Sequence, residues 1–347
     1  MKRSVRIVAF VSVFGAAVLS GCSRLVDEDQ SDCGGAVRID YRLRLVTNER
    51  TELETVLSEE KDIPVRNALQ AYLEGIFTDV AHDADLSFYE ETGVRLEHLE
   101  PVPERERFDC SLYLPAGTIL HACTANVADN GPVTLEGGDT GPSGHLVQHA
   151  DEDVADPHRT ALFAGRKTLS VKADADQQYE VDLTVVNAAT ALVLETEGAE
   201  GISGIQAYVA GFADGFHVAD STWIFTETSE VRTDDLPVEA GTQRCFASVH
   251  FPSRDYRPET RTITETAEPF RSEPSPEPLW RWRVYVRIAD GSVTESILEV
   301  MTPLRAGQLK VLKAKVFDTG IVSVTDPTVG VSVTLDWNEG GSHIIDF

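Results

Sequence analysis

Short segments in which apolar and polar residues alternate are the feature that most restricts the fold of this 347-residue chain. The clearest is Val37–Leu45, where nine positions alternate with the period of a strand that buries one face. Chains built from such strands usually form sandwiches, so the sequence predicts an all-β fold with little helix. Comparable segments are residues 111–114, 169–171, 179–186, 191–195, 281–288, 294–300, 308–316 and 329–335.

One segment has the spacing of a helix instead. Residues 66–77 place Leu69, Tyr72, Leu73 and Ile76 three or four positions apart, which puts them on one helical face. We expect this helix to pack beside the first sheet. A partner-binding face is the alternative interpretation of the same stripe.

The length of the chain and a short internal similarity predict two sandwich domains. A chain of 347 residues can bury one large core or two ordinary ones. The segments "LPAGTILHACTANV" and "PVEAGTQRCFASVHF" both place Ala-Gly-Thr before an alternating strand that carries a cysteine. This similarity suggests a duplication, with domains over residues 37–190 and 191–347.

The N-terminal residues are typical of a bacterial lipoprotein signal. Three basic residues within the first six precede an apolar run over residues 7–19, which is the length of a signal and short for a membrane span. The sequence "LSGC" then ends at Cys22 and matches the lipobox, in which the cysteine receives a diacylglycerol group. We therefore expect a signal peptide over residues 1–21 and lipidation of Cys22. An ordinary thiol near a conventional cleavage site is the alternative.

The residues after Cys22 are acidic, and so is the whole chain. Asp27, Glu28 and Asp29 lie in the segment 22–36, which we interpret as a solvated tether between the lipid and the folded part. The formal net charge is −27 and the pI about 4.6. A surface of this charge repels phosphate backbones, so nucleic acid is excluded as an expected partner.

No segment has the spacing of a catalytic, cofactor or metal site. The chain lacks a G-x-S-x-G elbow, a P-loop and a G-x-G-x-x-G turn, and Asp174-Ala175-Asp176 lacks the rest of a calcium loop. One polar loop is crowded with possible ligands, but its Gly and Pro residues provide no rigid helix for them. We therefore expect no enzyme, no cofactor and no metal. The loop residues are His145, His149, Asp151, Glu152, Asp153, Asp156 and His158.

Four cysteines remain once Cys22 is acylated. Export through an oxidising compartment permits disulfides among Cys33, Cys110, Cys123 and Cys245, but four cysteines allow three pairings. The sequence does not choose among these pairings.

Several segments together resemble the fimbrial anchor lipoproteins of Bacteroidales, the major and minor fimbrium anchoring subunits. The resemblance includes an "LFAGR" segment from Leu162, the "LPAGT" turn from Leu114 and the "VGVSVTLDWNEGG" ending at Gly341. The acidic residues after Cys22 also look like the surface-export tag of Bacteroidetes lipoproteins. The usual aromatic strand of the family after its first helix is poorly matched here by "ADLSFYEETG".

The resemblance implies two transthyretin-like β-sandwiches in tandem and a position at the base of a fimbria. It implies that the protein holds the filament to the outer membrane and influences its length. A strand exchanged with a pilin subunit would supply the contact, because an unpaired sheet edge accepts backbone hydrogen bonds. Two rivals are a glycan-binding lipoprotein that exposes Trp223, Trp280 and Trp282, and a hydrolase with an unrecognised carboxylate pair.

Overall fold

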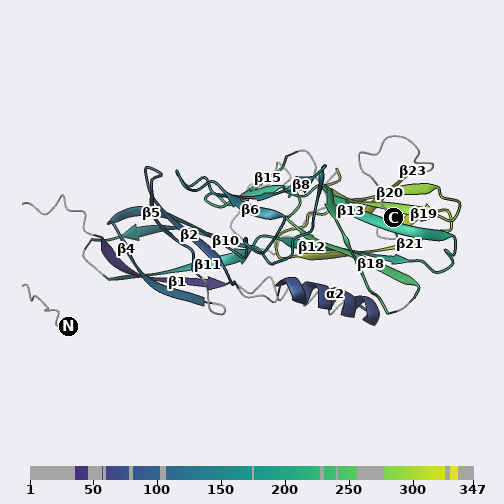
Figure 1. Ribbon diagram of the computed structural model, residues 1–347, viewed down its shortest axis with the longest axis horizontal. Coiled ribbons are helices and arrows are strands. Elements are labelled where there is room, and N and C mark those ends of the chain that lie inside the picture. The colour runs from purple at the N-terminus through teal and green to yellow at the C-terminus, as the bar shows by residue number, and fades with distance from the viewer. Residues whose placement is uncertain are drawn as a thin grey trace, which may run out of the picture. The chain divides into compact units, whose positions relative to one another are not determined.

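The structure, a computed structural model, describes part of the chain. The described residues are 36–45, 57, 60–77, 81–101, 107–173, 176–226, 230–239, 241–255, 277–324 and 329–334. They contain the helix α2 (Ile63–Phe77) and strands β1 to β23, which form four sheets (Figure 1). None of the described residues form a helix long and apolar enough to cross a membrane.

The first sandwich is one seven-stranded sheet folded over itself, in the order β3-β2-β5-β10-β11-β1-β4. β10 and β11 pair only at Phe163 with Val185 and at Ala164 with Thr184, so the sheet separates into two layers beyond this corner. The layers enclose a common core that includes Ile39. The strands are β1 (Val37–Leu45), β2 (Ala84–Glu90), β3 (Arg95–Leu99), β4 (Arg107–Leu114), β5 (Gly117–Ala125), β10 (Phe163–Val171) and β11 (Gln177–Val185).

The second sandwich packs two separate sheets face to face. A five-stranded sheet in the order β17-β18-β12-β21-β22 faces a seven-stranded sheet in the order β23-β20-β19-β13-β16-β9-β8, and both contribute to one core. The first of these contains β12 (Ala188–Glu195), β17 (Asp234–Leu236), β18 (Gln243–His250), β21 (Leu309–Val316) and β22 (Val322–Val324). The second contains β8 (Ala150–Asp151), β9 (Val154–Ala155), β13 (Ile202–Ala210), β16 (Glu230–Arg232), β19 (Trp280–Ile288), β20 (Val293–Val300) and β23 (Val329–Thr334).

A four-stranded sheet in the order β15-β14-β7-β6 covers the outer face of β2, β5 and β10. Its residues form a third core cluster with Tyr89, Ala122 and Ala164 of those strands. The strands are β6 (Val133–Glu136), β7 (His145–Gln148), β14 (Gly215–His217) and β15 (Thr222–Ile224).

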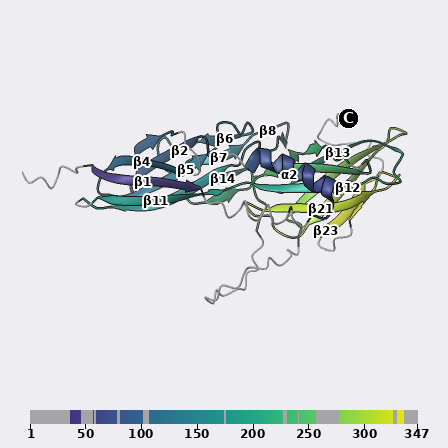
Figure 2. The ribbon, with the colours of Figure 1, turned by 90° about the horizontal axis from the view of Figure 1, so that it is seen from below.

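Helix α2 packs against the second sandwich, although it precedes most of the first sandwich in the chain. Leu69 lies in a cluster with Ala191 and Val193 of β12, and Leu73 lies in one with Leu309 of β21. Figure 2 shows α2 lying over this sheet. The expectation that the helix packs beside the first sheet is therefore wrong, because an amphipathic stripe specifies a buried face without specifying its partner.

The all-β fold with tandem sandwiches is confirmed. β1 has the bounds that the alternation predicts, and its inward residues Ile39, Tyr41 and Leu43 are buried. The turn between β19 and β20 uses Gly291 at a φ of 89°, where a glycine costs no strain. The domain boundary at residues 190 and 191 stays a prediction.

Candidate functional site

The predicted lipidation site and tether lie outside the described residues. This holds for Cys22, for the signal over residues 1–21 and for residues 22–35 of the acidic segment 22–36. Lipidation therefore stays a prediction from the sequence.

Three of the four remaining cysteines are described, and each is a free thiol. Cys123 lies in the core of the first sandwich, whereas Cys245 lies beneath α2 in another cluster. Burial raises the pKa of Cys245 to about 12 and that of Cys110 to about 11, so both remain protonated near neutral pH. Cys33 lies outside the described residues.

The loop residues considered as metal ligands separate in the fold. His158 is fully buried against Phe251, with ring centroids 4.7 Å apart, and burial lowers the pKa of His158 well below its ordinary value. Glu152 and Asp153 instead form the turn between β8 and β9 with positive φ angles. The hairpin between β8 and β9 therefore sets the positions of their carboxylates. Asp174 lies outside the described residues.

The three tryptophans proposed as a glycan platform are not exposed rings. Trp280 is 2% and Trp282 0% exposed, and both belong to the core of the second sandwich. Trp223 is partly buried and packs on Phe216, with ring centroids 4.5 Å apart. Trp280 and Trp282 therefore stabilise the second sandwich and offer no open face to a sugar, whereas Trp223 is buried in part against the four-stranded sheet.

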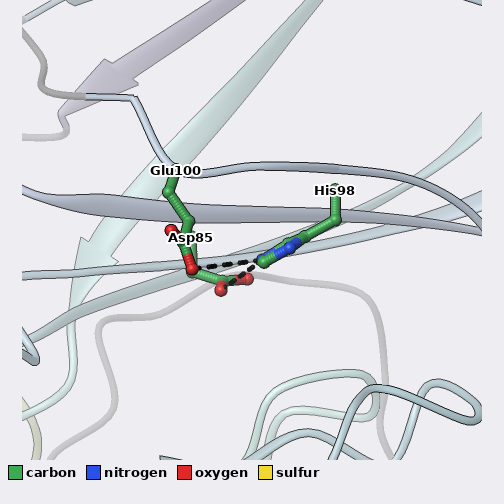
Figure 3. Close-up of side chains that lie close together, drawn as sticks. All are labelled: Asp85, His98 and Glu100. Carbon is green, nitrogen blue, oxygen red and sulfur yellow. Dashed lines mark hydrogen bonds and ion pairs between the residues drawn. The ribbon is translucent and has the colours of Figure 1, made fainter.

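One group of three potential metal ligands does form among the described residues, on β2 and at the end of β3. His98 is opposite Ser87 in the β2–β3 register, and Asp85 and Glu100 lie two positions from these residues. Because side chains alternate across a strand, the two-residue spacing places them on one face. Figure 3 shows the carboxylates of Asp85 and Glu100 beside the imidazole of His98.

The distances within this group are short. His98 Nε2 lies 2.7 Å from Asp85 Oδ2 and 4.0 Å from Glu100 Oε1. Ser87 Oγ donates to the other oxygen of Asp85, Oδ1, at 3.2 Å. A nucleophile activated by a histidine must contact the imidazole, and Ser87 contacts the carboxylate instead. The arrangement therefore differs from a serine hydrolase relay.

These side chains line a cavity of about 210 Å³ beneath the glycine-rich loop of residues 137–144, which connects β6 and β7. Tyr89 Oη donates to the carbonyl of Gly138 at 2.8 Å, and Arg95 pairs with Asp139 at 2.9 Å, so both contacts hold the loop over β2 and β3. The floor includes Thr124, which is 2% exposed and whose Oγ1 has no hydrogen-bond partner in the described part of the chain. The cavity thus joins carboxylates, an imidazole and an unsatisfied hydroxyl.

The sequence alone does not reveal this group, because its members come from different strands. His98 and Glu100 are two positions apart, which is the signal that places them on one side of a strand. Asp85 joins them only through the register of β2 and β3, which a single sequence does not specify.

The sheet edges are the other candidate site, because strand exchange requires one. Among the described residues, β4 ends the first sheet and pairs only with β1, from Val37 opposite Leu114 to Arg44 opposite Arg107. Tyr113 on this strand is 66% exposed. β4 spans eight residues, longer than the edge strands β3, β17 and β22. It therefore offers the longest edge of these four for an added strand.

No family model matches the chain, and no curated protein matches it. Among solved structures, it is similar to a candidate adhesin from Bacteroides thetaiotaomicron, with a TM-score of 0.50 and 9% identity over 87% of this chain and 98% of the other. The fimbrial anchor protein Mfa2 from Porphyromonas gingivalis gives a TM-score of 0.48 at 8% identity, covering 86% of this chain and 99% of that one.

A candidate polysaccharide-binding protein from Bacteroides thetaiotaomicron gives a TM-score of 0.49 at 8% identity, over 84% of this chain and 97% of the other. At these identities the comparisons concern the fold, and they say nothing of individual site residues. The resemblance drawn from the sequence is confirmed at that level: the chain has the tandem-sandwich fold of the adhesin structure.

Proposed function

We propose that this protein is a surface lipoprotein that anchors a fimbria to the outer membrane, without catalysis. The observation that carries the proposal is the tandem-sandwich fold, which it shares with a candidate adhesin along nearly the whole length of both chains. Cys22 would attach the protein to the membrane through its acyl chains, each methylene contributing about 0.8 kcal/mol of attachment. By resemblance to the anchor family, it would also limit filament length.

The contact with the filament would be an added strand, and β4 is the edge that fits best. Its edge position supplies backbone donors and acceptors, and the side chains of an incoming strand would meet exposed residues such as Tyr113. The neighbouring charges are paired within the sheet: Arg42 Nε lies 2.8 Å from Asp109 Oδ1, and Arg44 Nη2 lies 2.8 Å from Asp182 Oδ1. This face therefore needs no counter-charge from its partner.

Site-specific cross-linking on intact cells tests the edge. A photo-reactive phenylalanine replaces Tyr113 on β4, and the matched control carries it at Val94, an exposed apolar residue outside the strands that is 56% accessible. We expect a filament subunit, identified by mass spectrometry, to cross-link from position 113 and not from position 94. Equal yields at both positions, or no subunit at either, would reject β4 as the docking edge.

The membrane attachment is tested separately. The variant Cys22→Ala should release filaments into the medium while leaving the folded sandwiches intact, because Cys22 precedes every described residue. Filaments that remain on cells of this variant would contradict anchoring through Cys22. If filaments remain on these cells and a filament subunit still cross-links at position 113, the result rejects the lipid anchor and still supports the strand contact.

A further inference from the structure

The cavity beneath the glycine-rich loop carries an inference that is independent of the fimbrial role. We propose that Asp85, His98 and Glu100 form a binding site for one divalent transition-metal ion, with Zn²⁺ as the reference ion. The sequence predicts no metal site, whereas the register of β2 and β3 brings these three side chains together.

The geometry of the three side chains is close to that of a coordination sphere. Donors that surround a tetrahedral Zn²⁺ at about 2.0–2.2 Å lie roughly 3.4 Å from each other. The donor atoms of the group all lie within 4.8 Å of one another, including 2.7 Å between His98 and Asp85. Glu100 is 77% exposed, so its carboxylate can rotate towards the imidazole without displacing packed side chains.

A second observation points to a ligand at this place. Thr124 of β5 is opposite Asp85 of β2, so both side chains face the same cavity. The Thr124 hydroxyl is buried and has no hydrogen-bond partner in the described residues, which is unfavourable for a polar group. A water molecule bound to the metal ion would satisfy it.

The surrounding contacts resemble the outer sphere of a metal site. Ser87 Oγ donates to Asp85 Oδ1 and leaves Oδ2 directed towards His98. Such outer hydrogen bonds orient a ligating carboxylate. Arg95 also lines the cavity, but its charge is paired with Asp139 at 2.9 Å. Because the Arg95 guanidinium pairs with Asp139, the negative charges of Asp85 and Glu100 remain available to a metal ion.

The donor set decides which class of ion fits. Ca²⁺ and Mg²⁺ prefer spheres made of oxygen atoms, whereas one imidazole with two carboxylates suits Zn²⁺ and other transition metals. Binding would replace the contact between His98 Nε2 and Asp85 Oδ2, because a metal ion takes the lone pair of each donor atom. β3 is an edge strand, so the ion would fasten the end of that strand to β2.

Isothermal titration calorimetry of the full chain with ZnCl₂ tests the site. His98→Gln removes the imidazole, and the matched control is His149→Gln, at a residue between β7 and β8. His149 also faces a carboxylate, with Nε2 3.8 Å from Glu136, but it is not part of a three-ligand group in the described residues. We expect His98→Gln to lose affinity by more than the roughly 10- to 100-fold cost of removing an outer partner, and His149→Gln to match the wild type.

Thermal unfolding with and without Zn²⁺ provides a readout that also controls for folding. Zn²⁺ should raise the melting temperature of the wild type and of His149→Gln, whereas His98→Gln and Glu100→Gln should melt equally with Zn²⁺ and with EDTA. Four results would each overturn the site: no Zn²⁺ bound by the wild type, equal affinity in His98→Gln, an equal loss in His149→Gln, or tighter binding of Ca²⁺ than of Zn²⁺.

Discussion

A buried histidine in the first sandwich should make the protein lose stability in mild acid. His121 is 0% exposed, its Nε2 accepts a hydrogen bond from Tyr41 Oη at 2.6 Å, and its ring stacks on Phe88. Burial lowers the pKa of His121 to about 4 from 6.5, against the opposing hydrogen bond to the Ser87 carbonyl. Between pH 6.5 and pH 4 the imidazole is therefore neutral in the folded protein but protonated in the unfolded chain.

The sign and size of the effect follow from these two values. Above pH 6.5 both states are neutral and His121 contributes no pH dependence. Between pH 6.5 and 4 only the unfolded state takes up the proton, so stability falls as the pH falls, and below pH 4 the loss levels off. The pKa difference gives a loss of about 2 kcal/mol between pH 7 and pH 5, and about 3 kcal/mol in all.

The double variant Tyr41→Phe/His121→Phe isolates this contribution. Replacing both partners of the Tyr41–His121 hydrogen bond with apolar rings removes both polar side-chain groups and takes away only the imidazole donor to the Ser87 carbonyl, whereas Tyr41→Phe alone should cost about 1–3 kcal/mol. Urea unfolding followed by circular dichroism at pH 7 and pH 5 should show the wild type losing about 2 kcal/mol more than the double variant. Other titrating groups are common to both proteins, so equal losses would refute the assignment of a neutral buried imidazole.

Two further predictions concern stability. In β10, a Cβ at Gly165 would lie 2.5 Å from the carbonyl oxygen of Asp182, so Gly165→Ala should lower the free energy of unfolding by about 1–3 kcal/mol. Gly75 in α2 has open space around it, so Gly75→Ala should raise the free energy of unfolding by about 0.5–1 kcal/mol. Urea titrations that rank the two variants in the opposite order would contradict this packing. Arg283 pairs with two glutamates whose side chains are 6% and 11% exposed, so Arg283→Met should lower the free energy of unfolding by about 3–5 kcal/mol in the same assay. Arg38 forms an exposed pair, so Arg38→Met should cost about 0–1 kcal/mol. Similar costs for the two variants would show that burial of the ion pair does not determine its contribution.

The sequence alone determined those features that depend on the period of one segment. Alternation over Val37–Leu45 specified both the strand and its inward side chains, because a strand turns successive residues to opposite faces. The stripe that includes Leu69 and Leu73 likewise specified a helix with one buried face. The Asp-Gly pair at residues 290 and 291 lies between the alternating segments 281–288 and 294–300 and is typical of a turn, because glycine adopts a positive φ without strain.

Tertiary structure decided which of these surfaces meet. The helical stripe packs on β12, and β12 itself is buried almost throughout because the core covers one face and α2 covers part of the other. The candidate metal ligands have the same origin: Asp85 and His98 are thirteen positions apart, and only the pairing of β2 with β3 brings them within 2.7 Å. A periodic pattern records how one segment is buried, whereas contacts between segments depend on registers and packing that no single segment encodes.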